Sequence, residues 1–385
     1  MSGVPAESYI DPWSISFDSR FKNFMSGSKR LAYFYEQPDN STFRYRVYNM
    51  IQVIQANPHW GWSASFFSYE DRGRLERVVD SAHALVICRT RYNDEIAVLI
   101  ARARAKRAVV VYDIDDFVFD SSYVQLIVET LDQDLKNPTL YDFWFAYTAR
   151  LGAVMRLCDG VITTNSYLGE RVAEFSRLPV WIVPNFLNKE QMDVSEKVVL
   201  WKRSMHNDRN TVSIGYFSGT PSHNKDFSIA QEALASILDD YRDVTLRIVG
   251  YLDLRGRIMT HSSRIKMTKL VDFVNLQRYI GDVDINIIPL QDNLFTNCKS
   301  ELKYFEAGIV ETLSLASPTW VYTESIADRE NGFLVYAHEW EAALREVIES
   351  SDKRKQVALA ACADSKAKFA WYNQTTCLKK VVDSF

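Results

Sequence analysis

The sequence predicts an α/β protein built from two doubly wound, Rossmann-like domains. The chain of 385 residues is longer than one ordinary domain. Short apolar runs alternate with helix-period stretches, which is typical of parallel sheets covered by helices. The alternation weakens once, between residues 185 and 210, and then restarts. We therefore predict domains at 1–190 and 211–365, joined by a linker at 191–210.

The composition narrows the classes of protein to consider. With 47% hydrophobic and 24% charged residues, disorder and low complexity are excluded. The net charge of −4 argues against a nucleic-acid partner. The five cysteines lack metal-ligand spacing and indicate reduced thiols in a cytoplasmic protein. No signal peptide or spanning segment is predicted, while a peripheral contact with the inner face of the membrane stays open.

Strands and helices alternate through the first half. The runs at 84–88 and 108–112 are uninterrupted and apolar, as expected of strands covered on both faces. The predicted strands are residues 31–35, 63–67, 84–88, 108–112, 161–164 and 180–183. The predicted helices are residues 45–56, 70–79, 93–104 and 140–157.

The same pattern returns in the second half. Predicted strands are residues 211–217, 244–249, 284–288, 319–322 and 332–335. Predicted helices are residues 228–238 and 299–307, with a helical tail over 338–385. Ser228 and Gln231 match a capping box, which is a helix-start signal. Two such domains enclose a cleft at the carboxyl ends of their strands, where we expect the ligand.

The loop after the strand at 211–217 is the first candidate anion site. Its residues of interest are Ser218, Gly219, Thr220, His223 and Lys225. Small residues allow close approach of a ligand, and amides, hydroxyls and a lysine near a helix start favour phosphate. An ordinary polar turn explains the same residues, and the loop is neither a Walker loop nor a Gly-x-Gly-x-x-Gly motif.

The helix predicted from Lys299 is the second candidate. Its free amides, together with Lys299 and Ser300, form a suitable pocket for a pyrophosphate. Glu306 follows two turns later on the same face, where its carboxylate can accept hydrogen bonds from two ribose hydroxyls. A solvated helix face is the alternative.

An aspartate cluster follows the strand at 108–112. It consists of Asp113, Asp115, Asp116 and Asp120. Oxygen-rich clusters bind Mg²⁺, and a phosphatase with an aspartyl nucleophile has a similar strand end. We favour hydrogen bonding to an acceptor molecule, or a structural role, over a metal site and over a phosphatase. We expect Asp113 and Asp116 to face the cleft.

A cationic run and a polar pair are further candidates. The helix at 93–104 runs into four cations within residues 101–107, which complement the helix dipole or contact an anionic bilayer. Thr164 and Asn165 follow a strand and are expected at the cleft edge.

The order of these motifs resembles group 1 glycosyltransferases of the two-domain GT-B fold, most closely bacterial members that build surface polysaccharides. The main motif is Lys-Ser-x-Leu-Lys-x-x-Glu-Ala-Gly at 299–308, preceded by Ile-Pro-Leu-x-Asp-Asn-x-Phe. Gly-Tyr-x-Ser-Gly-Thr-x-x-His-Asn-Lys-Asp at 215–226, Val-Pro-Asn at 183–185 and Asn-Gly-Phe-Leu-Val at 331–335 are similar to family segments. The end of the chain is similar to the family's last helix, which implies that residues 366–385 return to the first domain.

The resemblance implies a role for each candidate. Glu306 corresponds to the ribose-binding glutamate, and the loop from Ser218 to Thr220 with Lys225 to the contacts of the donor diphosphate. Lys299 and Ser300 stand where family backbone amides contact the donor sugar and phosphate. Arg44 and Arg46 belong to an acceptor-side segment, where they meet a lipid-linked phosphate or are simply solvated. Cys298 replaces a second glutamate that many members have, so the donor sugar is not specified.

We therefore expect a retaining, metal-independent enzyme that transfers a sugar from a nucleotide-diphosphate sugar to a glycan or lipid-linked acceptor in bacterial surface polysaccharide synthesis. The nucleotide sugar is a co-substrate, and no further cofactor is expected. The expected catalytic residues are Asp113, Asp116, Lys225 and Lys299. A sugar-nucleotide epimerase or hydrolase of the same fold and a non-catalytic scaffold stay as alternatives.

Overall fold

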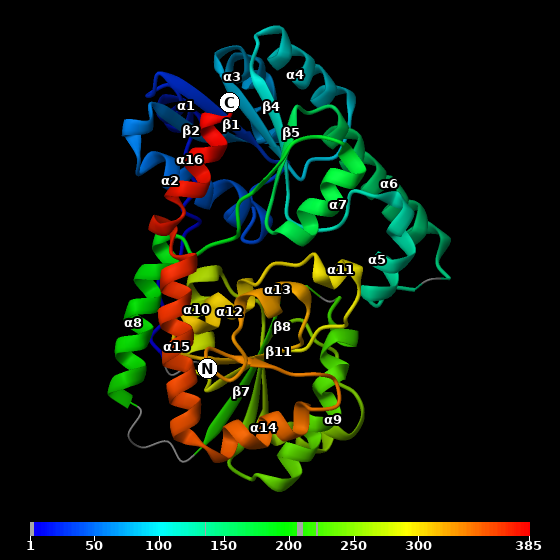
Figure 1. Cartoon of the computed structure of the whole chain (residues 1–385), viewed down its shortest axis with the longest axis vertical. Coiled ribbons are helices and arrows are strands. Elements are labelled where there is room, and N and C mark those ends of the chain that lie inside the picture. The colour runs from blue at the N-terminus through cyan, green and yellow to red at the C-terminus, as the bar shows by residue number, and fades with distance from the viewer. Residues whose placement is uncertain (1–3, 135, 206–210, 221) are drawn as a thin grey trace.

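The computed structural model consists of two units, each built on a six-stranded sheet (Figure 1). It describes residues 4–134, 136–205, 211–220 and 222–385. Neighbouring strands pair in parallel in the orders β2-β1-β3-β4-β5-β6 and β12-β11-β10-β7-β8-β9. The predicted architecture of two doubly wound α/β units is confirmed.

The strands follow the apolar runs of the sequence. The first sheet contains β1 (Lys29–Phe34), β2 (Trp62–Phe67), β3 (Ala84–Cys88), β4 (Val109–Ile114), β5 (Gly160–Thr163) and β6 (Val180–Ile182). The second contains β7 (Val212–Ser218), β8 (Val244–Gly250), β9 (Ile265–Thr268), β10 (Ile285–Ile288), β11 (Leu313–Ala316) and β12 (Phe333–Leu334). Of these strands, β9 and β11 were not predicted.

Helices connect the strands. The first unit contains α1 (Phe17–Phe24), η1 (Arg44–Tyr48), α2 (Asn49–Gln55), η2 (Pro58–Trp60), η3 (Tyr69–Arg74), α3 (Leu75–Ser81), α4 (Asp94–Ala105), η4 (Ser121–Tyr123), α5 (Val124–Thr130), α6 (Pro138–Arg156) and α7 (Ser166–Ser176). The second contains α8 (Lys189–Met205), α9 (Asn224–Asp240), η5 (Gly256–Arg264), α10 (Phe273–Gly281), α11 (Leu294–Asn297), α12 (Leu302–Gly308), α13 (Trp320–Ser325), α14 (Trp340–Glu349) and α15 (Ser351–Phe369). The chain ends with η6 (Trp371–Asn373) and α16 (Thr375–Asp383).

Each sheet is buried on both faces, because successive side chains of a strand point to opposite sides. In β1, Phe34 packs in an apolar cluster with α1, α3 and α4, whereas Tyr33 packs in another with α2 and α16. In β7, Tyr216 and Phe217 are likewise divided between two clusters. Burial on both faces explains the uninterrupted apolar runs of β3 and β4.

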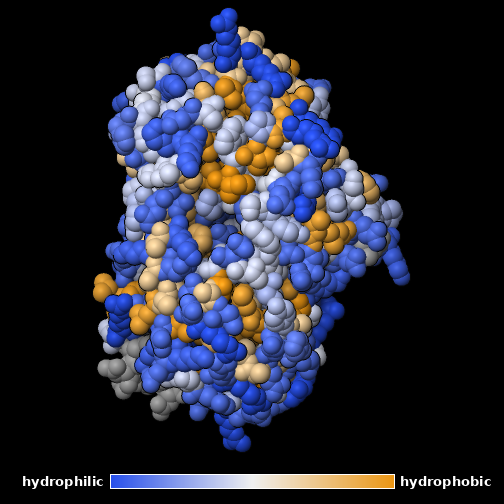
Figure 2. Space-filling model, in the orientation of Figure 1, coloured by the Kyte–Doolittle hydropathy of each residue, from blue (hydrophilic) through white to orange (hydrophobic). Residues whose placement is uncertain are grey.

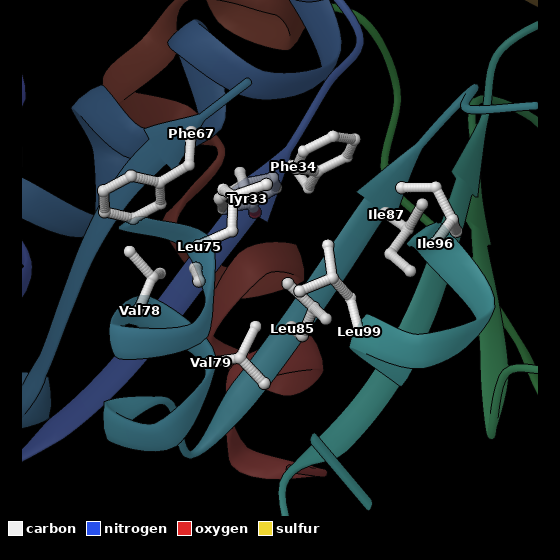
Figure 3. Close-up of a pocket in the computed structure, with 11 residues that line it drawn as sticks. Tyr33, Phe34, Phe67, Leu75, Val78, Val79, Leu85, Ile87, Ile96 and Leu99 are labelled. Atoms are coloured by element: carbon white, nitrogen blue, oxygen red, sulfur yellow. The ribbon is translucent and has the colours of Figure 1, made fainter. Parts of the chain in front are cut away.

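The core of the first unit is closely packed around a cavity of only about 10 Å³. Figure 3 shows its lining of apolar and aromatic side chains, which come from β1, β2, α3, β3 and α4. Such a volume is at the lower limit for one water molecule. This cavity is therefore part of the core and not a ligand site.

The chain crosses between the units after β6 and again after α15. Helix α8 packs against α10 of the second unit, and α16 packs against α2 of the first. The two crossings lie side by side. Leu187 N–H donates to the carbonyl of Phe369 at 2.8 Å, and Leu187 forms an isolated parallel β-bridge with Ala370. Figure 1 shows α16 beside α2, as the resemblance implied for the end of the chain.

The predicted linker is not an extended connection. Its described part, up to residue 205, lies in helix α8, and residues 206–210 lie outside the described residues. Because α8 packs on α10, it belongs by its contacts to the second unit.

Two local predictions are wrong. The predicted strand at 319–322 is the start of α13, and the apolar run before Pro318 forms strand β11 instead. Ser228 is not a helix cap, because α9 begins at Asn224 and the Ser228 hydroxyl donates to the carbonyl of Lys225 inside the helix. In both cases the residue types fit a local motif, while the actual element begins several residues earlier.

The outer surface is largely polar. Figure 2 shows hydrophilic residues over most of one face, with hydrophobic residues in separate patches. Among the described residues, no helix is long and apolar enough to span a bilayer.

Candidate functional site

A cleft of about 510 Å³ lies between the two units. Its lining residues follow strands of both sheets: Asp115 and Asp116 follow β4, Gly219 and Thr220 follow β7, and Leu290 follows β10. The cleft is therefore at the carboxyl ends of the strands, where doubly wound sheets bind ligands. Its volume is that of a small-molecule site.

Most of the predicted site residues line this cleft. They are Arg44, Asp116, Ser218, Gly219, Thr220, His223, Lys299, Ser300 and Glu306. The remaining predicted residues, which are Arg46, Asp113, Thr164, Asn165 and Lys225, are not part of its lining.

Glu306 of α12 is a buried carboxylate that joins the two units. Its Oε1 accepts hydrogen bonds from the Tyr45 hydroxyl at 2.5 Å and from Gln191 Nε2 at 3.2 Å. The Arg44 guanidinium lies 3.4 Å from the same oxygen and over the Tyr45 ring. Arg44 and Tyr45 belong to η1, which is a π-helix. This conformation is rare in proteins as a whole, but many of its examples lie at functional sites.

The backbone of β8 packs closely against the start of the loop after β7. Ser218 Oγ donates to the Thr220 carbonyl at 2.9 Å, while a Cβ on Gly219 would meet no atom within 4 Å. Gly250, at the end of β8, has φ +101°, and a Cβ there would lie 1.7 Å from the Ser218 carbonyl oxygen. Glycine is thus required at 250 and not at 219.

His223 precedes α9 and is held by Asp226. Its Nδ1 lies 2.9 Å from Asp226 Oδ2, and Asp226 Oδ1 accepts hydrogen bonds from Gln291. Burial lowers the pKa of His223, and the nearby Lys303 and Lys299 lower it further, against the effect of Asp226. The imidazole is therefore predominantly neutral near pH 7 until an anion approaches.

Two lysines supply positive charge to the cleft. Lys299 Nζ lies 4.7 Å from the centroid of Phe295, and Lys303 Nζ lies 5.3 Å from that of Tyr216. Burial lowers the pKa of Lys303 to about 8, and Lys299 acts in the same direction. Helix α12 begins at Leu302 rather than at Lys299, so the prediction of a helix start at Lys299 is wrong.

The aspartate cluster is dispersed in the structure. Asp115 and Asp116 line the cleft on the side of the first unit. Asp115 is held by Arg89 Nη1 and by the Thr42 hydroxyl, both at 2.9 Å. Asp120 instead accepts a hydrogen bond from the Ser122 N–H. Within the described ranges, no group of three or more His, Cys, Asp or Glu residues is arranged to hold a metal ion.

Asp113 and Arg46 do not face the cleft, contrary to prediction. Both are completely buried, and Arg46 donates to the two carboxylate oxygens of Asp113 at 2.8 and 3.1 Å. Arg46 also donates to the Val183 carbonyl and to Asn185 Oδ1. Burial raises the pKa of Asp113 to about 6, against the effect of Arg46. The pair joins β4 to the first crossing and cannot contact an acceptor.

Lys225 and Asn165 connect the units outside the cleft. Lys225 Nζ donates to the Glu129 carbonyl at 2.8 Å and lies 3.7 Å from Asp132. Asn165 caps α7, and its Nδ2 donates to the Lys299 carbonyl at 3.2 Å and to the buried Thr164 hydroxyl. Lys225, Thr164 and Asn165, predicted to contact the diphosphate or the acceptor, thus have protein partners outside the lining of the cleft.

Cys298 is buried between the units. With Phe295 it belongs to the apolar cluster of the first unit, and the Cys298 carbonyl lies 3.4 Å from Asn165 Nδ2. Burial raises the pKa of its thiol above the usual range. A glutamate at this position would place a charge in this apolar cluster, at a cost in free energy of folding.

Sequence reasoning missed several residues of the site. Lys303 was inside the main motif and Asp115 inside the aspartate cluster, so both were visible as residue types. Tyr45 lay between the two arginines of the acceptor-side segment but was not singled out. Gln191 and Arg89 carried no motif, because their partners come from distant segments of the chain.

Replacement of Arg46 tests the structural role of its buried pair. Arg46→Met leaves Asp113 buried without its partner, which should lower the free energy of unfolding in urea by about 3–5 kcal/mol. The double variant Arg46→Met/Asp113→Leu should recover most of this loss, because an apolar pair needs no charge compensation. An Arg46→Met protein of unchanged stability would contradict this role.

Comparison with known proteins supports the fold and one domain. Residues 211–350 match the family model described as glycosyl transferases group 1. HepE of Anabaena in complex with UDP is similar at 13% identity and a TM-score of 0.61, over 92% of this chain and 100% of that chain. Sucrose-phosphate synthase from Thermosynechococcus elongatus is similar at 13% identity and a TM-score of 0.60, over 92% and 98% of the chains.

A glycosyltransferase from Rickettsia africae is similar at 14% identity and a TM-score of 0.60, over 93% of this chain and 98% of that chain. No curated protein matches the sequence significantly. The chain thus has the GT-B fold, and its residues 211–350 match the model of the group 1 glycosyl transferases.

Proposed function

We propose that this protein transfers a sugar from a nucleotide-diphosphate sugar to an acceptor. The observation that carries the proposal is the composition of the cleft. Glu306 and the basic side chains of Lys299 and Lys303 lie on the second unit, and Asp115 and Asp116 line the opposite side. A carboxylate for hydroxyls and cations for phosphates are the groups that a nucleotide sugar requires.

Glu306 is the proposed ribose ligand. Its hydrogen bonds from Tyr45 and Gln191 go to Oε1, which leaves Oε2 for ligand hydroxyls. The bond from Tyr45 fixes the carboxylate before the ligand binds, so less ordering is required on binding. Since HepE forms a complex with UDP, uridine diphosphate is the first nucleotide to consider.

The lysines are proposed to stabilise the leaving diphosphate. Charge develops on the β-phosphate as the bond between its oxygen and the anomeric carbon of the donor sugar breaks and the bond from that carbon to the acceptor oxygen forms. Cations already in place lower the barrier without reorganisation. Lys299 and Lys303 would serve this role without a metal ion. In place of the predicted catalytic Lys225, which binds the first unit here, Lys303 is the better candidate.

The acceptor is proposed to enter on the side of the first unit. Asp115 and Asp116 can accept hydrogen bonds from acceptor hydroxyls, and Arg44 of the acceptor segment lines the same cleft. We infer from the resemblance that the acceptor is a glycan or a lipid-linked precursor of a bacterial surface polysaccharide. The anomeric configuration would be retained, with the leaving phosphate taking the acceptor proton. Closure of the cleft would exclude water.

A thermal-shift screen tests this function. The panel is UDP, GDP, TDP and CMP with their common sugar conjugates, with and without Mg²⁺. A ligand at a hundred times its Kd stabilises by about 2.7 kcal/mol, so we expect a clear shift from one diphosphate family, independent of Mg²⁺. Absence of any shift would favour a scaffold. Turnover of the donor without an acceptor would favour an epimerase or hydrolase.

Glu306→Ala tests the ribose contact. Loss of charge-assisted hydrogen bonds should weaken UDP binding by about 2 kcal/mol, about thirtyfold in Kd. Inorganic pyrophosphate has no ribose, so the part of its binding that UDP displaces should be equal in the variant and the wild type. The exposed Glu330→Ala is the matched control. Equal losses for UDP and pyrophosphate would show that Glu306 acts on the fold of the cleft and not on the ribose.

The pH dependence of donor binding tests Lys303. Because burial lowers its pKa to about 8, the lysine is charged below this pH and neutral above it. A bound anion favours the charged form, so the Kd for UDP-glucose should be constant below pH 8 and increase as the pH rises above it. Lys303→Arg keeps its charge and should remove this increase. Identical profiles for both proteins would contradict the assignment.

A further inference from the structure

A second polar hollow lies at the opposite end of the first unit. Its volume is about 310 Å³. Its basic lining consists of Lys29, Arg30, His83, Lys106 and Arg107, beside the ring of Trp62. Val109, at the start of β4, also lines it. The cleft lies beyond the other end of this strand, about 20 Å away at the usual rise per residue, so the hollow is separate from the proposed donor site.

The strand register brings these cations together. Lys29 pairs with Trp62, and Leu31 pairs with Ala84. Arg30, near the start of β1, therefore lies beside His83, which directly precedes β3, at the same end of the sheet. The His83 N–H donates to the Arg30 carbonyl at 2.8 Å, and Val109 N–H donates to the His83 carbonyl at 3.1 Å. Lys106 and Arg107 lie just before β4, which begins at Val109. Segments that are distant in sequence therefore meet at one hollow.

Several of these side chains are already positioned. Lys29 Nζ lies 5.0 Å from the centroid of Trp62. Arg30 Nε donates to the Ser81 carbonyl at 2.6 Å. His83 Nδ1 accepts from the Arg30 N–H at 3.1 Å, which leaves Nε2 to carry the ring proton. The pKa of His83 is lowered, by burial first and then by Arg30 and Lys29.

Among the described residues, the basic side chains of the hollow outnumber the acidic groups that line it. The one acidic side chain of its lining is Asp80, and both oxygens of Asp80 accept hydrogen bonds from Arg102, at 2.7 and 2.8 Å. Across these residues, Lys29, Arg30, Lys106 and Arg107 have no carboxylate within ion-pair distance. An anion is therefore the complementary ligand.

We propose that this hollow binds a phosphate-bearing ligand. Arginine offers paired donors that match phosphate oxygens, lysine adds point charges, and the neutral His83 donates from Nε2. Lys106 and Arg107, which follow α4, form the outer side of the site. Their interaction with the dipole of α4 explains their position only in part. The phosphate belongs either to a soluble ligand or to the headgroup of a lipid. The proposal does not depend on the donor site.

Calorimetric titration with inorganic pyrophosphate, in the presence of saturating UDP, tests the proposal. Lys106→Glu/Arg107→Glu should weaken pyrophosphate binding at least tenfold, and Lys106→Gln/Arg107→Gln should have an intermediate effect. The matched control is Arg242→Glu/Lys355→Glu, which makes the same change of net charge on exposed side chains of the second unit. It should bind as the wild type does.

Vesicle sedimentation distinguishes the two sources of phosphate. Binding to phosphatidylglycerol vesicles, but not to phosphatidylcholine vesicles, that is lost only in Lys106→Glu/Arg107→Glu would indicate a lipid headgroup. Pyrophosphate binding without vesicle binding would indicate a soluble ligand. Absence of both, or equal losses in the two charge-reversal variants, would overturn the proposal. UDP binding, measured separately on the same proteins, reports on the donor site alone.

Discussion

The hydrogen bonds that meet at Glu306 hold the two halves of the molecule in register. A buried carboxylate requires partners, and here they come from η1 of the first unit and from α8 after the first crossing. The second crossing lies against the first through Leu187 and Phe369. The facing edges of the sheets, and hence the cleft between them, depend on this arrangement. If Oε2 binds ribose, one side chain takes part in both domain closure and donor binding.

Much of the fold could be predicted from local patterns. Central strands such as β3 and β4 are buried on both faces, so their apolar runs are unmistakable. Strand β9 was missed because it is a half-exposed edge strand with the pattern Ile-Lys-Met-Thr. Strand β11 was missed because its apolar run contains a serine and ends at Pro318, while the β-branched residues that follow belong to α13. In these segments the pairing partner, and not the local sequence, determines the element.

The site was predictable at the level of loops and less so at the level of side chains. The motifs indicated the loop after β7 and the segment around α12, and both line the cleft at the ends of the strands. They did not distinguish Arg44 from Arg46, or Asp116 from Asp113. Which arginine and which aspartate face the cleft depends on a contact between residues 67 positions apart in the sequence. Arg46 and Asp113 form an ion pair inside the first unit. Once paired, each is unavailable to a ligand, and its neighbour faces the cleft instead.

The position of Cys298 extends this reasoning to the donor sugar. The segment from Gln291 to Lys299 docks on the first unit, where Gln291 donates to the Thr130 carbonyl and Asn293 to the Thr130 hydroxyl. Cys298 is packed into the same interface. A side chain there cannot reach a ligand, so recognition of the sugar in a transferase of this kind must come from groups that line the cleft. On the proposed acceptor side of the cleft, Asp115 is held by hydrogen bonds from Arg89 and Thr42, and Arg89 also donates to the Thr42 hydroxyl. A fixed carboxylate of this kind discriminates between hydroxyls by their position, because only a hydroxyl that reaches one of its remaining lone pairs can donate to it.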